Sequence, residues 1–182
     1  MRRKRYPMLS EPLTLYKLMI LYMLKRVKFP LTNSQISEFF LSKEYTTYFT
    51  LQQALAELTD AHLIQVETTQ NSTLYELTRE GEDTLGFFGK KISDLIIQDM
   101  EEYLKENRVR MRDEVSTLAD YYRSTNQDYV VHCEIREGRA SLIELNVSVP
   151  DEKQAELMCS NWQQSSQNIY SFIMKELMQE ED

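Results

Sequence analysis

The chain has 182 residues, of which 42% are hydrophobic, and its formal net charge is −8. This composition is sufficient for a folded core in one large domain or two small ones. No apolar run approaches the roughly 20 residues of a membrane span, and charged residues interrupt the segment after the basic start, which argues against a signal peptide. We therefore expect a cytoplasmic protein, with Cys133 and Cys159 as free thiols.

The charge is unevenly distributed along the chain. Through residue 90 there are 11 Lys and Arg against 10 Asp and Glu, a balance of +1. From residue 91 the counts are 10 and 19, a balance of −9. Only the first half is electrostatically compatible with a phosphate backbone, so we expect the second half to face a partner, a small ligand or solvent.

The first two segments are a basic arm and a helix. The arm, residues 1–11, is either a solvated tail or a contact to phosphate or the minor groove. A helix is predicted to start near Pro12 and to end before Pro30. Its apolar residues recur at three- and four-residue spacing: Leu15, Leu18, Met19, Tyr22 and Met23.

Residues 32–81 have the pattern of two helices and a hairpin. Thr32 can cap the first helix, with Gln35 reaching back as in a capping box. A second helix is predicted from Tyr45 or Thr46 to near His62. Two strands, over 63–69 and 73–78, flank a polar turn at 70–72, and Thr78 can cap a further helix. This order predicts a winged helix-turn-helix.

Several motifs in this region carry a family resemblance. The run Tyr75-Glu76-Leu77-Thr78-Arg79-Glu80-Gly81 is similar to the tyrosine-x-leucine-threonine-x-x-glycine signature that closes the wing in PadR-like and MarR-like bacterial regulators. The wider layout, including residues 31–36, residues 48–55 and a late Asn161-Trp162, resembles the bacterial family DUF4364, a domain of unknown function. The resemblance covers nearly the whole chain and implies a winged helix joined to an α+β domain, with a regulatory role and no known ligand or operator.

The predicted helix after Tyr45 is the candidate recognition helix. At about 100° per residue, one side collects apolar residues. These are Tyr48, Leu51, Ala54, Leu55 and Leu58. The other side carries Thr46, Phe49, Thr50 and Gln53, which we predict to face DNA: Gln can bond adenine edges, Thr can contact phosphate or a thymine methyl, and Phe can pack on that methyl. Alternatively, Phe49 packs on the preceding helix or on a dimer mate.

Phosphate contacts present a difficulty for the DNA-binding hypothesis. There is no Lys or Arg between Tyr45 and His62, nor in residues 63–78. Because phosphate neutralisation dominates DNA affinity, contacts would have to come from flanking cations. These are Arg2, Arg3, Lys4, Arg5, Lys25, Arg26, Lys28, Lys43 and Arg79. The alternative is a winged helix that serves as a protein-interaction module.

The second half is predicted to be an α+β dimerisation or sensing domain over 89–182, after a winged domain over 1–88, with the boundary at the glycines of 86–89. A helix from Lys91 or Ser93 is followed by strands over 114–123, 129–136 and 140–149. Asp151 and Gln154 then resemble a capping box for a last helix. The first helix carries one apolar stripe, which suits a core or subunit pairing: Ile92, Leu95, Ile96, Met100, Tyr103 and Leu104. The last helix is predicted to face the sheet with Ala155, Met158, Trp162, Ile169, Ile173 and Leu177.

The sequence offers few parts for catalysis. His132 and Cys133 are adjacent on a predicted strand, so they point to opposite faces and cannot form a nucleophile–base pair. Neither metal-ligand spacing nor a phosphate-binding glycine loop is present. Four aromatic residues either line a small-molecule pocket or belong to the sheet and core. They are Tyr121, Tyr122, Tyr129 and Trp162.

These observations predict a DNA-binding regulator of α+β fold that acts as a homodimer on double-stranded DNA. No enzymatic activity, metal or cofactor is implied. A small-molecule effector is left open without support.

Overall fold

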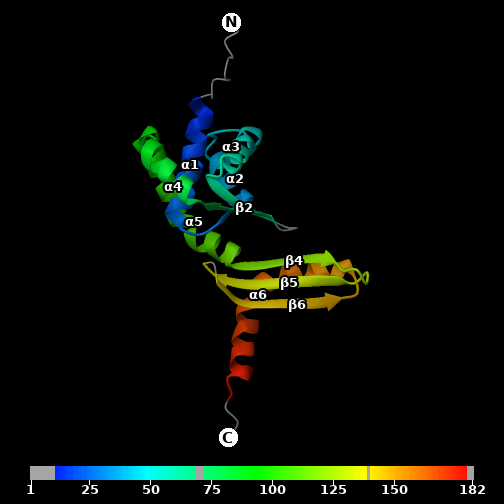
Figure 1. Cartoon of the computed structure of the whole chain (residues 1–182). Coiled ribbons are helices and arrows are strands. Elements are labelled where there is room, and N and C mark those ends of the chain that lie inside the picture. Colours follow the sequence, from blue (N-terminus) through cyan, green and yellow to red (C-terminus); the bar gives the residue numbers. More distant parts are fainter. Residues whose placement is uncertain (1–10, 69–71, 139, 180–182) are drawn as a thin grey trace. The chain divides into compact units, whose positions relative to one another are not determined.

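The computed structural model describes residues 11–68, 72–138 and 140–179, which form a mixed α+β fold (Figure 1). The described part contains six α-helices and two three-stranded antiparallel sheets. It divides into two compact units, with the change falling between Val109 and Arg110. The segment 86–89, which we predicted to be the boundary, lies inside the first unit. Residues 1–10 of the predicted basic arm, the last residue of the predicted strand 63–69, and two residues of the predicted turn, Gln70 and Asn71, lie outside the described residues.

Helix α1, Glu11–Val27, is the central helix of the first unit and confirms the prediction. Its buried residues lie on more than one face because α1 contacts α3, α4 and β3. Met19, Ile20, Leu21 and Met23 are all fully buried. None of the described helices is both long and apolar enough to cross a membrane.

Helix α2, Asn33–Ser42, has the predicted capping box. The Thr32 hydroxyl accepts a hydrogen bond from the Gln35 backbone N–H at 3.1 Å, and the Gln35 side-chain oxygen accepts from the Thr32 N–H at 3.0 Å. Strand β1, Leu31–Thr32, was not predicted: it pairs antiparallel with β3. Two residues give too short a pattern to be recognised without the partner strand.

Helix α3 spans Tyr48–Asp60, so its predicted start at Tyr45 or Thr46 is wrong. The residue that caps α3 is Thr47, whose hydroxyl accepts from the Thr50 N–H at 3.3 Å. Tyr45 instead donates its N–H to Phe40 O at 2.9 Å and closes the C-terminal turn of α2. Three consecutive residues that can cap or begin a helix therefore left the start ambiguous in the sequence.

Strands β2, Ile64–Thr68, and β3, Thr73–Leu77, form the predicted hairpin. Thr78 caps α4, Arg79–Phe88, by accepting from the Gly81 N–H at 3.0 Å. Gly81 is required here because a Cβ would lie 2.0 Å from the Leu63 carbonyl oxygen. A short 3₁₀ helix, Gly89–Lys91, then leads to α5.

Helix α5, Asp94–Ser116, has a narrower apolar stripe than predicted. Ile92, Met100 and Leu104 are buried, but Leu95 is 71% exposed. The prediction for Leu95 is therefore wrong: Ile96 and Ile97 of the same turn are half-buried, so Leu95 lies on the side of this turn that does not pack. The helix also continues to Ser116, two residues past the predicted strand start at Glu114. An i,i+4 ion pair between Arg110 and Glu114, at 3.1 Å, supports this last turn.

The second unit is a meander of β4, Thr117–Arg123, β5, Tyr129–Glu137, and β6, Ala140–Val149, packed against α6, Glu152–Leu177. Asp151 caps α6 by accepting from the Gln154 N–H at 2.9 Å. The core of the unit is formed by residues from β5, the end of β6 and α6: Val131, Cys133, Ile135, Val149, Ala155 and Trp162.

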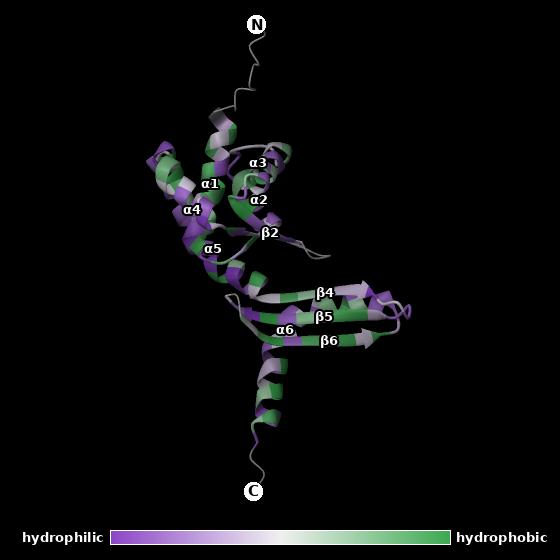
Figure 2. Cartoon of the chain, viewed as in Figure 1, coloured by the Kyte–Doolittle hydropathy of each residue, from purple (hydrophilic) through white to green (hydrophobic). Residues whose placement is uncertain are grey.

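The last turns of α6 run past the strands (Figure 1) and carry several hydrophobic residues (Figure 2). Leu177 is 80% exposed, so its predicted contact with the sheet is wrong. The periodicity was read correctly, but a 26-residue helix is longer than the sheet it covers.

Candidate nucleic-acid interface

Helix α3 has one buried side and one exposed side. Leu51, Ala54, Leu55 and Leu58 are buried, as predicted. Tyr48 is 56% exposed, which corrects its assignment to the apolar side: as the first helical residue it lies beyond the packed turns. The exposed side presents polar and aromatic groups directly before the β2–β3 hairpin.

Three of the predicted DNA-facing residues lie on α3 and one does not. Phe49 is 80% exposed and does not pack on the preceding helix. Thr50 is half-buried, and its hydroxyl lies 3.0 Å from that of Thr47. Thr46 is half-buried in the turn before α3, so helical spacing does not place it beside the others.

Gln53 is exposed but already has a partner. Its Nε2 donates to Glu57 Oε1 at 3.1 Å, and Glu57 Oε2 accepts from Lys17 Nζ at 2.9 Å. The hydrogen bond from Lys17, aided by that from Gln53, holds the pKa of Glu57 below its ordinary value. Gln53 must give up its bond to Glu57 before it can bond a base edge, at a cost of about 1 kcal/mol.

The two predicted phosphate-binding cations differ in their surroundings. Lys43 is the C-cap residue of α2, and its Nζ lies 3.7 Å from Asp99 Oδ1 on α5. The other Asp99 oxygen accepts from the Tyr45 hydroxyl at 2.5 Å. Arg79 is exposed at the first position of α4. Lys43 is therefore held toward α5, whereas Arg79 lies at the end of the hairpin.

Other cations of the first unit are also paired with carboxylates. Lys25 Nζ lies 3.2 Å from Glu82 Oε1 on α4, and Arg26 makes a two-pronged ion pair with Glu101 on α5. A DNA phosphate would have to compete with these carboxylates. Positive charge available to DNA is thus smaller than the residue count of the first half indicates.

A polar network that we did not predict fixes α3 relative to α2 and the hairpin. Asn33 Nδ2 donates to Gln52 Oε1 at 2.9 Å, and Gln52 Nε2 donates back to Asn33 Oδ1 at 3.1 Å. Asn33 Nδ2 also lies 3.2 Å from the Tyr75 hydroxyl on β3. These residues are 19 and 42 positions apart, so no local pattern signals the network. Of the three residues, only Tyr75 belongs to a motif noted in the sequence, where it is the first residue of the run that closes the hairpin.

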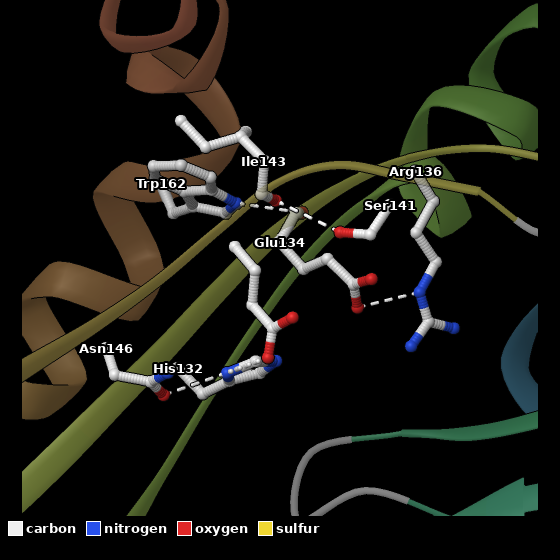
Figure 3. Close-up of polar contacts among 8 residues, drawn as sticks. His132, Glu134, Arg136, Ser141, Ile143, Asn146 and Trp162 are labelled. Carbon is white, nitrogen blue, oxygen red and sulfur yellow. Dashed lines mark hydrogen bonds and ion pairs between the residues drawn. The ribbon is translucent and has the colours of Figure 1, made fainter. Parts of the chain in front are cut away.

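The second unit carries a polar cluster on the sheet face opposite α6 (Figure 3). His132 Nδ1 lies 3.0 Å from Asn146 Oδ1 and 3.6 Å from Glu144 Oε1. Arg136 Nε donates to Glu134 Oε2 at 2.7 Å. The contacts of His132 run from β5 to β6, whereas Arg136 and Glu134 both lie on β5. Among the described residues, no group of three or more His, Cys, Asp or Glu could hold a metal ion.

Neither His132 with Cys133 nor the aromatic set forms a reactive or binding site. Cys133 is buried in the core on the α6 side, away from His132, as predicted. Tyr121, Tyr129 and Trp162 pack in or against that core, whereas Tyr122 is 55% exposed. The four aromatic residues therefore do not line one pocket.

A hollow of about 530 Å³ in the first unit lies between α1 and α5. Its lining mixes both signs of charge: Arg26, Glu101, Glu102, Lys105 and Arg108 are among the lining residues. Arg26 is paired with Glu101, and Arg108 donates to the Val27 carbonyl at 3.4 Å. The hollow gives no specific support to a small-molecule effector.

Comparison with known proteins identifies one family. The model of a family described as "Domain of unknown function (DUF4364)" matches residues 16–177, which spans both compact units. No curated protein and no solved structure matches the chain.

Proposed function

We propose that this chain, which belongs to the DUF4364 family, is a winged-helix transcriptional regulator that binds double-stranded DNA as a homodimer. The observation that carries the proposal is the exposed side of α3. It presents Phe49 and Gln53 opposite the buried row and is followed directly by the β2–β3 hairpin. The element order α1, β1, α2, α3, β2, β3 supports the proposal, because it is compatible with a winged helix.

In this proposal α3 enters the major groove. Gln53 bonds an adenine edge, Phe49 packs on a thymine methyl, and Thr50 contacts phosphate or a methyl group. Arg79, which follows the hairpin at the start of α4, contacts the phosphate backbone of the DNA beside the major groove. A two-fold dimer then reads a pseudo-palindrome with half-sites about one helical turn apart. The network of Asn33, Gln52 and Tyr75 supports this role because it holds α3 and the hairpin in a fixed relation.

The ion pairs of the first unit predict a weaker dependence of binding on salt than the number of flanking cations indicates. Each phosphate contact costs about 3.5-fold in affinity when salt rises from ~50 to ~200 mM. With Lys25, Arg26 and Lys43 held by carboxylates, we expect the phosphate contacts to come from Arg79, Lys28 and the cations of the basic arm. Binding then depends on base contacts and on two subunits acting together.

A second function is favoured by one specific observation. Tyr48 and Phe49 are adjacent and strongly exposed, and residues 45–78 contain no Lys or Arg. An exposed aromatic pair on a surface without Lys or Arg suits a protein partner, since aromatic residues are enriched in protein interfaces. The alternative proposal is a winged-helix interaction module without sequence-specific DNA binding.

A genomic-fragment selection with the purified full-length protein at two salt concentrations tests the proposal. We expect enrichment of a pseudo-palindromic site. The double substitution Thr50→Ala with Gln53→Ala should weaken binding to it by at least ~10-fold, since a good base contact is worth about 1–3 kcal/mol.

Gln163→Ala, which removes an exposed glutamine from α6, is the matched control and should bind as the unmodified protein does. Circular dichroism verifies that each variant is folded. The absence of enrichment at low salt, from folded protein, would contradict the proposal. Capture of a protein partner that is lost with Phe49→Ala would then support the interaction module.

A further inference from the structure

We propose that strand β6 pairs with β6 of a second copy of this chain, forming a continuous six-stranded antiparallel sheet across a two-fold axis. The strand order β4-β5-β6 leaves β4 and β6 as the edges of the sheet (Figure 1). This inference goes beyond DNA recognition, because it names the surface that joins two subunits and depends only on the second unit.

The two edges of the sheet differ in how they are protected. On β4, the Asp120 carboxylate accepts the Tyr121 N–H at 2.8 Å, so a side chain of the strand occupies that backbone donor. β4 has seven residues, two of them charged: Asp120 and Arg123. β6 has ten residues, no proline, and a single charged residue, Glu144. Natural proteins protect edges by short length, charge, proline or β-bulges. β6 has one bulge, at Leu142 near its start, where Ser141 pairs with Arg136 and Ile143 with Ile135. From Ile143 to Val149 the strand is regular and has only the charge of Glu144 as protection.

The apolar row of β6 is incompletely covered within the unit. Helix α6 packs mainly on β4 and β5. Val131 on β5 is fully buried, whereas its cross-strand neighbour Val147 is 38% exposed. Ile143 and Leu145 on the same face are half-buried. A strand added beside β6 would extend this apolar face and cover the row.

The sequence of β6 is complementary to itself in the antiparallel direction. An axis at Leu145 places Ile143 opposite Val147 of the second copy and Leu145 opposite its own equivalent. It also places Glu144 opposite Asn146 of the second copy. An axis at Glu144 would instead oppose two carboxylates, which is destabilising. With one charge in ten residues, two acidic copies can approach along this strand, and the contact closes as a two-fold dimer.

Substitution of Val147 tests the interface. We expect the unmodified protein to sediment as a dimer without DNA, and Val147→Lys to raise the dissociation constant of the dimer at least ~10-fold. Leu177→Lys is the matched control: it places the same charge at an apolar residue that is 80% exposed on α6, and the dimer should persist. A monomeric unmodified protein, or a dimer unaffected by Val147→Lys, would overturn the proposal.

Cysteine crosslinking tests the register even if Val147→Lys perturbs folding. Because β6 has a bulge at Leu142, the test uses positions past it. The axis at Leu145 brings Ile143 opposite Val147 of the second copy, whereas the two Val147 residues lie about 13 Å apart at ~3.3 Å per residue. Oxidation should therefore link the subunits of Ile143→Cys/Val147→Cys but not of Val147→Cys alone. Absence of the crosslink in a folded double variant would refute this pairing. Because DNA takes no part in either test, failure of DNA binding does not affect the result.

Discussion

At the scale of single residues, two left-handed positions direct the chain into and out of α3. Glu44 and His62 have φ values of 54° and 57°, although neither is glycine. Each follows a helix end where the next residue returns its N–H to the helix: Tyr45 to Phe40 O and Leu63 to Leu58 O, both at 2.9 Å. These closing bonds compensate the unfavourable conformation. The turns at Glu44 and His62 determine where α3 begins and where the chain passes from α3 into the hairpin.

The thiols of Cys133 and Cys159 give a prediction at this scale. Burial raises the pKa of Cys133 to about 11 and also raises that of Cys159. Because the thiolate is the reactive form, both thiols should react slowly with a disulfide reagent in the folded protein and rapidly in denaturant. Cys133→Ser distinguishes the two thiols. Rapid reaction of Cys133 in the folded protein would contradict its burial, whereas Cys159 is only half-buried.

At the scale of elements, α1 and α5 are joined by one polar cluster. The Glu101 carboxylate on α5 accepts from the Tyr22 hydroxyl at 2.5 Å and pairs with Arg26, both on α1. Burial and the hydrogen bond to Glu101 raise the pKa of Tyr22 to about 12, so this hydroxyl stays protonated at neutral pH. The hydrogen bond from Arg26 lowers the pKa of Glu101, with Tyr22 contributing.

The lowered pKa of Glu101 predicts a pH-dependent contribution to stability. The folded pKa is below the unfolded one, so the contribution is present above the ordinary value of 4.5 and is lost as pH falls through the lowered value. Glu101→Gln should lower the free energy of unfolding by up to about 1 kcal/mol at neutral pH, since the pair is partly exposed. Denaturant unfolding at neutral and acidic pH should show this difference shrinking at acidic pH.

Glu102→Gln removes the neighbouring exposed carboxylate and serves as the control. It should leave the free energy of unfolding nearly unchanged. An effect of Glu101→Gln that persists unchanged at the acidic pH would show that the ion pair and its hydrogen bonds are not its cause.

At the scale of the whole molecule, the chain forms two compact units. The second unit has a core built only from its own residues, with Trp162 at its centre. Trp162 is 4% exposed, and its indole N–H donates to the Glu134 carbonyl at 3.3 Å. It is also the only tryptophan in the chain.

Trp162→Phe should therefore destabilise the second unit selectively. The loss of buried volume and of the hydrogen bond should cost about 1–3 kcal/mol. Hydrogen exchange should show reduced protection in β4, β5 and β6, with the amides of α1 and α3 unchanged. Equal loss of protection in both units would mean that they unfold as one cooperative unit.

Local sequence determined most of the elements. Thr32, Thr78 and Asp151 cap the helices for which they were predicted, and the β2–β3 hairpin and the β4–β5–β6 meander lie where residue alternation and turn residues indicated. Of the candidate site, the exposure of Phe49 and Gln53 followed from helical spacing. These features depend on interactions within about one helical turn or between neighbouring strands, which a sequence displays directly.

The tertiary structure decided which groups the candidate site has at its disposal. Glu57, the partner of Gln53, lies four residues along the same helix, but its second oxygen is bound by Lys17 of α1. Lys43 lies beside Asp99 of α5. The contacts with Lys17 and Asp99 depend on packing between helices. Lys17 and Glu57 are 40 residues apart, and Arg26 and Glu101 are 75 apart. Packing also decided that Leu95 and Leu177 are exposed. An ion pair between distant segments forms only when the chain folds, so the sequence near either residue does not show its partner. Periodicity along a helix shows which side is apolar, but it does not show how much of that side a neighbouring element covers.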